Sequence, residues 1–280
     1  MGYQIRNTLG TGARSTIYQV EDPQSGEVYA LKKVVRDSQT DYRFFEQTEN
    51  EYKVSVRLNH PYLRRSFKLE KRRRWLRLTE MYLLMEYFEG RSLEQSPPHS
   101  LAQIAWIFTR AAEALRSMHE NGFVHADIKP NNILLGESST LKLIDFGQSC
   151  PLGTIKQRIQ GTPDYIAPEQ VKRQPIDART DVFNLGATIY WTLMGKPLPT
   201  LISSVRPGRK VNLISDLQLK VPHEVNDKIP PALSVLVMNC VAKSPNERPA
   251  NMNTVLKRLE MVRLSETELA ADRNRSETKQ

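Results

Sequence analysis

Three oxygen-bearing side chains, spaced over nineteen residues, restrict this chain more than any other feature. Asp127 and Asn132 lie in the segment His125-Ala126-Asp127-Ile128-Lys129-Pro130-Asn131-Asn132, just after the helix-stop signal Asn121-Gly122. Asp145 comes thirteen residues after Asn132, behind a short apolar run and directly before Phe146-Gly147. Loop caps and turns alone do not call for this combination, whereas a phosphoryl-transfer site does.

Each of these residues suits one task in phosphoryl transfer. Asp127 is placed to accept a hydrogen bond from the hydroxyl that receives the phosphoryl group. Lys129, two residues later, is placed to neutralise charge on the migrating group. Asn132 and Asp145 offer oxygen ligands, which a hard cation such as Mg²⁺ prefers. The stretch therefore predicts the acceptor and metal side of a transfer site.

A candidate phosphate cradle lies near the start of the chain. Gly10, Gly12 and Ser15 fall between two predicted strands, where small residues let the backbone approach a phosphate. Taken alone, such a turn is more often plain hairpin chemistry. It gains meaning from Ala30 and Lys32 on the next strand, because a lysine beside a small residue can reach nucleotide phosphates.

Hydrophobic periodicity divides the chain into a β-rich first part and a helical second part. The predicted strands are 3–9, 16–21, 27–34, 63–69, 76–85, 133–135 and 141–144, with a basic turn between the fourth and fifth. The predicted helices are 44–58, 101–120, 180–194, 231–242 and 251–263. The pattern indicates an α+β protein, and 280 residues suffice for two lobes.

Together these motifs resemble the eukaryotic-type protein kinase superfamily, from about Tyr3 to about Arg263. Further matches are the segment 161–169, which resembles the end of an activation segment, and Asp181, which matches a helix aspartate that braces the catalytic loop. The resemblance also implies two ion pairs, Lys32 with Glu51 and Arg248 with Glu169. Glu46 and Glu49 are weaker candidates for the partner of Lys32.

The resemblance implies a two-lobed kinase fold that binds ATP and Mg²⁺. It implies a small, mostly β N-lobe with one main helix at about 1–85, a hinge at 86–90, a larger helical C-lobe at 91–263, and a polar, disordered tail at 264–280. The implied catalytic residues are Asp127, Lys129, Lys32 and Glu51, and the implied metal ligands are Asn132 and Asp145. The implied nucleotide-binding residues are Leu9, Gly10, Gly12, Ser15, Ile17, Ala30, Lys32, Met85, Glu86, Phe88 and Leu134, with Met85 as gatekeeper and the backbone of Glu86 and Phe88 facing the base.

Lys129 together with Thr162 resembles serine/threonine kinases rather than tyrosine kinases, and 164–170 is similar to bacterial members. The protein substrate would then carry a serine or threonine acceptor. Two rival functions stay open at this stage. A pseudokinase scaffold usually lacks one of the lysine and aspartate residues present here, and a small-molecule phosphotransferase of the antibiotic-kinase type lacks the segment that ends at Glu169.

Four positions depart from the family pattern, among them Asn131, which stands in place of a frequent glutamate. Ser15 stands in place of a third glycine, and Ser55 lies where an apolar side chain usually packs. Ala126 stands in place of an arginine that commonly binds a phosphate on the activation segment, and alanine has no donor for such a contact. We therefore expect that phosphorylation of Ser149 or Thr154 is not required for activity.

Much of the basic excess behind the net charge of +9 lies in one stretch. Its basic residues are Arg64, Arg65, Lys68, Lys71, Arg72, Arg73, Arg74 and Arg77. A solvated face is the ordinary interpretation, and a docking patch for an acidic protein, a membrane or a nucleic acid is the alternative. Nucleic acid is the weakest of the three because no ladder of aromatic residues accompanies the run, which holds only Phe67 and Trp75.

No run of eighteen or more apolar residues predicts a transmembrane helix. Residues 1–7 lack the apolar core of a secretory signal. Cys150 and Cys240 lie far apart and show no metal-type spacing, which is usual for a reduced protein. We expect a cytoplasmic location.

Overall fold

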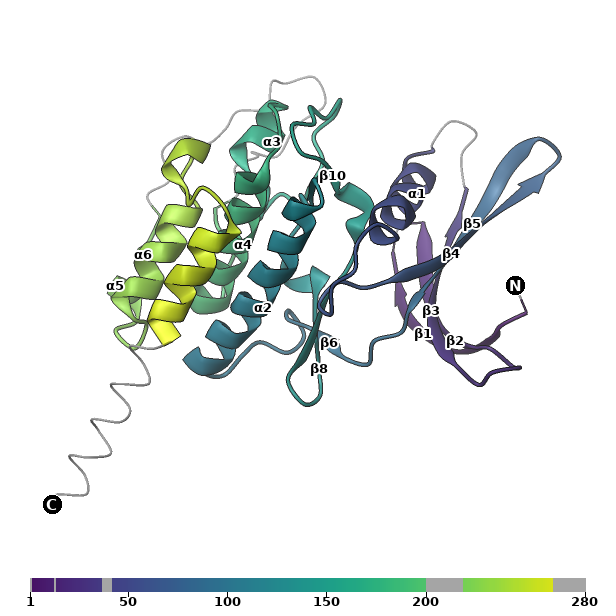
Figure 1. Cartoon of the computed structure of the whole chain (residues 1–280), viewed down its shortest axis with the longest axis horizontal. Helices are drawn as coiled ribbons and strands as arrows, with labels where there is room; N and C mark the ends of the chain where they lie inside the picture. The colour runs from purple at the N-terminus through teal and green to yellow at the C-terminus, as the bar shows by residue number, and fades with distance from the viewer. Residues whose placement is uncertain (1, 13, 37–41, 200–218, 264–280) are drawn as a thin grey trace, which may run out of the picture.

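The computed structural model describes residues 2–12, 14–36, 42–199 and 219–263. A β-rich lobe and a helical lobe lie side by side along the longest axis of the molecule (Figure 1). This arrangement confirms the predicted α+β class with two lobes. In the described ranges, no helix combines the length and the apolar character needed to cross a membrane.

The N-terminal lobe is built on a five-stranded antiparallel sheet in the order β1-β2-β3-β5-β4. Its strands are β1 (Gln4–Thr11), β2 (Ser15–Glu21), β3 (Val28–Val35), β4 (Ser66–Arg74) and β5 (Arg77–Glu86). Val34, Met81 and Leu83 on the central strands are buried, and they pack toward the one long helix of the lobe. The register pairs Lys32 of β3 with Leu83 of β5, which aims Lys32 at the inter-lobe side.

That helix, α1 (Arg43–Ser55), is amphipathic, and its buried face includes Phe45, Glu51 and Val54. The prediction carried the helix on to Leu58. The chain instead tightens after Ser55, where the amide of Leu58 donates to the carbonyl of Ser55 at 3.2 Å, a spacing typical of a 3-10 turn. Helix α1 also contacts the turn η2 (Phe146–Gln148) of the other lobe.

The fourth predicted strand was misplaced. Leu63 forms an isolated parallel bridge with Leu143, and β4 begins at Ser66 and continues to Arg74. The predicted basic turn is therefore strand, and the turn itself consists of Trp75 and Leu76. Consecutive charged residues suggested a loop, but cross-strand pairing with β5 overrode that local signal.

The C-terminal lobe packs its helices around the buried face of α2 (Leu101–Glu120). Ser100 caps this helix as predicted, because its hydroxyl accepts from the amide of Gln103 at 3.1 Å. Phe108, Leu115 and Met118 have no exposed surface and form the centre of the core. The other helices are α3 (Pro168–Lys172), α4 (Ala178–Met194), α5 (Pro222–Val225), α6 (Pro231–Cys240), the turn η3 (Pro245–Glu247) and a last helix at 252–263.

Short strands at the junction of the lobes carry the polar loops. One sheet pairs β6 (Arg91–Ser92), β8 (Ile133–Gly136) and β9 (Thr140–Leu143), and another pairs β7 (Phe123–Val124) with β10 (Cys150–Pro151). The turn η1 (Pro130–Asn132) links β7 to β8. The sequence from β7 to β10 thus brings both predicted polar motifs to the same edge of the lobe.

Candidate active site

The loop that carries Asp127 is held in place by a buried carboxylate of the C-terminal lobe. Asp181 of α4 accepts from the amides of His125 and Ala126, each at 2.8 Å, and lies 2.8 Å from Nε2 of His119. Burial acts to raise the pKa of Asp181, but the contact with His119 and the neighbouring donors hold that pKa below its ordinary value. The bracing role predicted for Asp181 is confirmed.

This bracing supports an unusual backbone conformation. Ala126 has φ 61°, in the left-handed region that non-glycine residues rarely adopt. The carboxylate of Asp181 holds the amide of Ala126, and the residue is fully buried. The bend directs the next side chain, Asp127, toward the junction of the two lobes.

Asp127 is held by hydrogen bonds that converge on its carboxylate from Thr162, Lys129 and, at 3.5 Å, Nδ2 of Asn132. Thr162 donates to Oδ1 from both its amide (3.0 Å) and its hydroxyl (2.9 Å), and Nζ of Lys129 donates to Oδ2 at 3.0 Å. Lys129 also donates to the hydroxyl of Thr162 at 2.7 Å. Asp127 is 7% exposed, so the orientation of its carboxylate is set by these contacts. The use of Thr162 in this role was not predicted.

The two candidate metal ligands come from the turns η1 and η2. Asn132 donates from Nδ2 to the carbonyl of Asp127 at 2.8 Å, which leaves its amide oxygen for another partner. Asp145 has φ 67°, and its carboxylate accepts from the amide of Gly147 at 3.4 Å. Burial acts to raise the pKa of Asp145, but the charge of Lys32 and that of Lys129 bring it below its ordinary value.

The donor set of Asn132 and Asp145 fits Mg²⁺. Both side chains offer oxygen atoms, and the carboxylate of Asp145 stays ionised at neutral pH. Among the described residues, no three His, Cys, Asp or Glu side chains cluster as a metal site of their own. Mg²⁺ in nucleotide sites takes most of its ligands from phosphate oxygens and water, so one or two protein side chains are enough to hold it.

Lys32 pairs with Glu51, as predicted. Its Nζ lies 2.7 Å from Oε2 of Glu51, whose side chain is 1% exposed. Burial acts to lower the pKa of Lys32, but the carboxylates of Glu51 and Asp145 outweigh it and raise that pKa. The competing glutamates lie elsewhere, because Glu49 pairs with Lys53 and Lys71, and Glu46 lies near Arg158.

Arg64 has a role that its place in the basic run concealed. It is 7% exposed, and its guanidinium donates to Oε1 of Glu51 at 2.9 Å. The hydroxyl of Ser55, where an apolar residue was expected, donates to the carbonyl of Arg64 at 2.9 Å. Arg64 therefore does not belong to the predicted surface patch. A hint was available in Ser55, because a polar residue on the buried face of a helix needs a polar partner.

The polar residues enclose a cavity of about 360 Å³ between the lobes. It is lined by Gly12, Ser15, Lys32, Val34, Phe44, Gln47, Thr48, Asp127, Lys129, Asp145, Gly147, Gln148, Gly161 and Thr162. The first hairpin contributes Gly12 and Ser15 to this lining, and the amide of Gly12 donates to the carbonyl of Ser15 at 2.7 Å. Gly10 lies on β1 outside this lining set. The cavity has the polarity and the cations that a chain of phosphates needs.

The predicted apolar residues for the base do not line this cavity. Ala30 and Met85 are buried in one cluster with Ile17 packed against it, while Leu9 is 46% exposed on β1 and Leu134 is half-buried on β8. These residues come from both lobes around the predicted hinge. Their contact with a nucleotide stays a prediction.

The hinge residues offer backbone groups rather than side chains. The amide of Glu86 already donates to Arg65, and its carboxylate pairs with Lys142 at 2.7 Å. The ring of Phe88 lies against the α-carbons of Gly90 and Gly136, where a Cβ atom would come within 2.8 Å of it. The two glycines therefore make room for Phe88, and its backbone N–H is what it can offer to a base.

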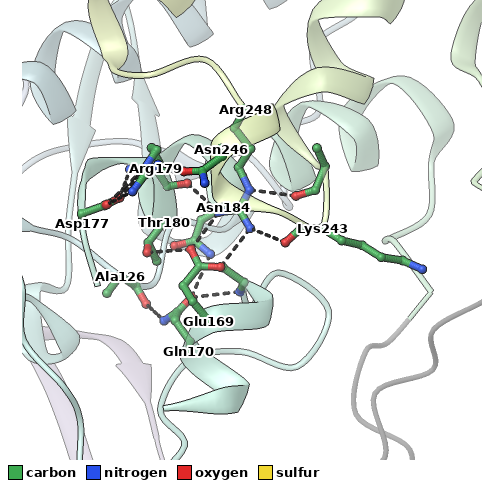
Figure 2. Close-up of polar contacts among 12 residues, drawn as sticks. Ala126, Glu169, Gln170, Asp177, Arg179, Thr180, Asn184, Lys243, Asn246 and Arg248 are labelled. Carbon is green, nitrogen blue, oxygen red and sulfur yellow. Dashed lines mark hydrogen bonds and ion pairs between the residues drawn. The ribbon is translucent and has the colours of Figure 1, made fainter. Parts of the chain in front are cut away.

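A second glutamate–arginine pair anchors the segment that ends at Glu169, as predicted. Figure 2 shows Arg248 donating to both carboxylate oxygens of Glu169, at 2.7 and 2.9 Å. Its other N–H groups donate to the carbonyls of Ala242, Arg179 and Lys243. All five guanidinium N–H groups are thus satisfied in a buried setting.

Gln170 ties the same segment to the catalytic loop, and it was not predicted. Its Nε2 donates to the carbonyls of Ala126 (2.8 Å) and Gln160 (3.2 Å). Its Oε1 accepts from the amide of Ala167 at 3.0 Å and from Asn184 at 3.2 Å (Figure 2). The side chain of Ala126 has no hydrogen-bond donor. The neutral amide of Gln170 instead links the backbone of the catalytic loop at Ala126 to the activation segment at Gln160.

Asn50 of α1, in the N-terminal lobe, contacts the turn η2 and the residue after it in the C-terminal lobe. Its Nδ2 donates to the carbonyls of Phe146 (3.2 Å), Gly147 (3.3 Å) and Ser149 (2.8 Å). This contact couples the position of α1 to the turn that carries Asp145. No local sequence signal distinguishes Asn50 from an exposed polar residue of a helix.

Comparison with known proteins agrees with this geometry. The family described as protein kinase domain matches residues 3–259. A probable serine/threonine-protein kinase of Clostridium acetobutylicum is 27% identical over 93% of this chain and 40% of its own length. An Aurora kinase of Eremothecium gossypii is 34% identical over 70% of this chain and 53% of its own, and the serine/threonine-protein kinase PknB of Mycobacterium tuberculosis is 27% identical over 88% and 40%. The chain thus spans about half or less of the length of these relatives.

Proposed function

This chain belongs to the protein kinase domain family, and on that premise we propose that it transfers the γ-phosphoryl group of ATP to serine or threonine hydroxyls of proteins. The observation that carries the proposal is the shared cavity of Asp127, Lys32 and Asp145. A scaffold that only bound nucleotide would not need the carboxylate of Asp127 to be held by Thr162 and Lys129.

In this mechanism Asp127 accepts a hydrogen bond from the acceptor hydroxyl and takes up its proton. The hydroxyl oxygen forms a bond to the γ-phosphorus, the bond to the bridging β–γ oxygen breaks, and ADP leaves. Lys129, 3.0 Å from Asp127, stabilises the negative charge of the migrating group. Lys32, held by Glu51, binds the α- and β-phosphates from the opposite side.

Protein kinase domains use ATP with Mg²⁺, and Asn132 and Asp145 would hold the metal here. When bound, the metal neutralises charge on the phosphate oxygens. The adenine would lie among Leu9, Ile17, Ala30, Phe88 and Leu134, beside Met85, with Glu86 and Phe88 offering backbone hydrogen bonds and Gly10, Gly12 and Ser15 covering the phosphates.

We further propose that the catalytic domain spans 1–263, with lobes that meet at the hinge 86–90. The hydroxyl of Thr162 between Asp127 and Lys129 supports serine and threonine as acceptors, as do the relatives named above. Cys150 and Cys240 are free, buried thiols, which supports action in a reducing compartment such as the cytoplasm.

The central test is Asp127→Asn, assayed with labelled ATP, Mg²⁺ and a protein substrate. We expect transfer to fall by a factor on the order of 10²–10⁴, with nucleotide affinity nearly unchanged, because Asp127 contacts the acceptor and not the nucleotide. Asp227→Asn, an exposed aspartate of the C-lobe, is the matched control. Normal transfer by Asp127→Asn would contradict the proposed role, and an inactive wild-type protein that binds ATP would indicate a scaffold.

The metal assignment is tested separately. Asp145→Ala and Asn132→Ala should weaken binding of ATP with Mg²⁺ more than binding of ATP alone, because both residues supply oxygen ligands. Nucleotide titrations with and without Mg²⁺ measure this difference. The same magnesium dependence in wild type and variants would remove both residues from the metal site.

A further inference from the structure

The hairpin of β4 and β5 ends in the two most exposed large apolar side chains of the described residues. Trp75 is 92% exposed and Leu76 is 96% exposed. They form the whole turn, because Arg74 pairs with Arg77 across it. The hairpin reaches past the rest of the sheet, at the end of the molecule remote from the helical lobe (Figure 1). This tip therefore has no packing function in the fold.

The turn itself does not call for these residues. Trp75 has φ 58°, a left-handed conformation that favours glycine or asparagine at the first position of a two-residue hairpin turn. A bulky side chain there is a conformational cost that the hairpin would avoid with glycine. An outlier of this kind, with its ring in solvent, points to a role outside the fold.

The tip is surrounded by cations. Residues 72–77 are all exposed and contain four arginines and no acidic residue. Arg72 approaches Glu70 and Glu80, whereas in the part of the chain that the structure describes no carboxylate pairs with Arg73, Arg74 or Arg77. A strand rises about 3.3 Å per residue, so the α-carbons of these three arginines lie within about 7 Å of the turn residues along the hairpin.

A structural role of charge on an edge strand does not account for the whole feature. β4 is the edge of the sheet, and charged residues there prevent edge-to-edge pairing. That explains Lys68 and Lys71, which lie along the strand near Glu70 and Glu49. It does not explain an apolar pair beyond the last charged residue.

We propose that the tip of the β4–β5 hairpin docks on an anionic membrane surface. Trp75 and Leu76 enter the boundary between headgroups and acyl chains, and Arg73, Arg74 and Arg77 contact the lipid phosphates. Tryptophan favours this boundary because one part of its ring system is apolar and its N–H is polar. Arginines a few residues behind the apolar tip lie at headgroup depth, since interfacial segments enter by about 5–10 Å.

The shape of the tip favours a bilayer over a folded partner. A stable protein interface buries about 1,200–2,000 Å² with matching surfaces, and a convex tip of two residues offers a small fraction of that area. A bilayer needs no shape complementarity. Single-stranded nucleic acid is bound in grooves where several aromatic rings stack with bases, and this tip has one ring and no groove.

Co-sedimentation of the full 280-residue chain with vesicles tests the proposal. We expect binding to phosphatidylcholine vesicles that contain phosphatidylserine, weaker binding at high salt, and no binding to phosphatidylcholine alone. Each arginine near the surface contributes roughly a fivefold factor, so the triple variant Arg73→Gln, Arg74→Gln, Arg77→Gln should bind about a hundredfold more weakly. The pair Trp75→Ser, Leu76→Ser should also lose binding.

Matched control variants separate the effect of the hairpin tip from the effects of overall net charge and of exposed apolar surface elsewhere. The triple variant Lys172→Gln, Lys228→Gln, Lys257→Gln removes the same charge from exposed sites of the C-lobe. The pair Val225→Ser, Met261→Ser removes exposed apolar side chains there, at 56% and 68% exposure. Both controls should bind vesicles as the wild type does, and all variants should keep the wild-type melting temperature.

Tryptophan fluorescence tests insertion directly. The chain has three tryptophans, and vesicles should shift the emission of the wild type to shorter wavelength. Trp75→Leu keeps an apolar tip, so it should bind vesicles without that shift. Lys32→Met should bind like the wild type, which separates this proposal from the proposed catalysis.

Several results would overturn the proposal. They are equal binding to vesicles with and without phosphatidylserine, equal losses in the control variants, and an emission shift that survives in Trp75→Leu. Absence of vesicle binding, with capture by polyglutamate or duplex DNA that the tip variants lose, would assign the hairpin to an acidic protein or to nucleic acid instead.

Discussion

Each lobe contains a buried glutamate bound by an arginine, and the two carboxylates are used differently. Glu169 receives two hydrogen bonds from Arg248 and one from Thr180 at 2.8 Å, all within the C-lobe. Glu51 divides its two oxygens between Lys32 at 2.7 Å and Arg64 at 2.9 Å, which come from separate elements of the N-lobe. The Glu169–Arg248 pair forms its contacts within the C-lobe, and we call it the closed anchor. The Glu51 group connects α1, β3 and the segment before β4 on the nucleotide side of the site.

From this difference we expect the Glu169 pair to support stability and the Glu51 pair to support activity. Arg248 also saturates three backbone carbonyls and lies over the ring of Phe183 at 4.8 Å, so its loss would leave many buried groups without partners. Arg64 makes a single hydrogen bond to Glu51. This hydrogen bond helps to keep Glu51 of α1 directed at Lys32. Loss of Arg64 should therefore lower the rate of phosphoryl transfer more than it lowers the free energy of unfolding.

The largest expected effect belongs to the closed anchor. Arg248→Met should lower the free energy of unfolding by about 3–5 kcal/mol, because it leaves the buried carboxylate of Glu169 without its counter-charge. Urea denaturation measures this loss. Arg179→Met is the control, since its ion pair with Asp177 is partly exposed and should contribute less than about 1 kcal/mol. Equal losses would contradict the distinction between anchor and surface pair.

On the catalytic side, Lys32→Met should leave the protein folded and lower transfer by a factor on the order of 10²–10³, because the phosphates lose their cation. Melting temperature without nucleotide and single-turnover transfer measure the two properties. Lys33→Met is the control, because Lys33 is the next residue on β3 and pairs with Glu80 on the other face. A large fall in the melting temperature of Lys32→Met alone would indicate a structural lysine.

Arg64→Met should have an intermediate effect that sharpens the comparison. Loss of one hydrogen bond to a charged group, worth about 1.5–3 kcal/mol, should lower kcat/KM by roughly tenfold or more, while Lys32 still holds Glu51. Arg64→Lys should recover part of the activity. Arg65→Met, at an exposed neighbour, is the control. A double-mutant cycle with Lys32→Met that shows simple additivity would argue against coupling through Glu51.

The smallest effect is expected from the activation segment. Ser149 is 4% exposed and donates to the carbonyl of His125, so it is not accessible to a kinase, and Thr154 is the remaining candidate of the two. Thr154→Ala and phosphatase-treated wild type should both transfer at nearly the wild-type rate, because the amide of Gln170 links the segment to Ala126. A tenfold loss in both would show that a phosphate is required.

Much of the site followed from the order of residues along the chain. The partners Lys32–Glu51 and Glu169–Arg248, and the bracing by Asp181, were all expected and all confirmed. Helices with a clear apolar stripe, such as α2, were also predicted closely. What was missed shares one property, because Arg64, Gln170 and Asn50 are polar residues whose partners lie on other elements.

The amino-acid sequence alone specifies which chemical groups are available and roughly where strands and helices begin. Local preferences and short motifs carry that information, since turns, caps and apolar periodicity depend on near neighbours. The packing of the folded chain, in contrast, turns Arg64 inward to Glu51 and leaves Arg73, Arg74 and Arg77 exposed to solvent near Trp75. All four arginines look alike in the sequence, and burial with a carboxylate partner, rather than residue type, separates the positioning residue from the surface ones.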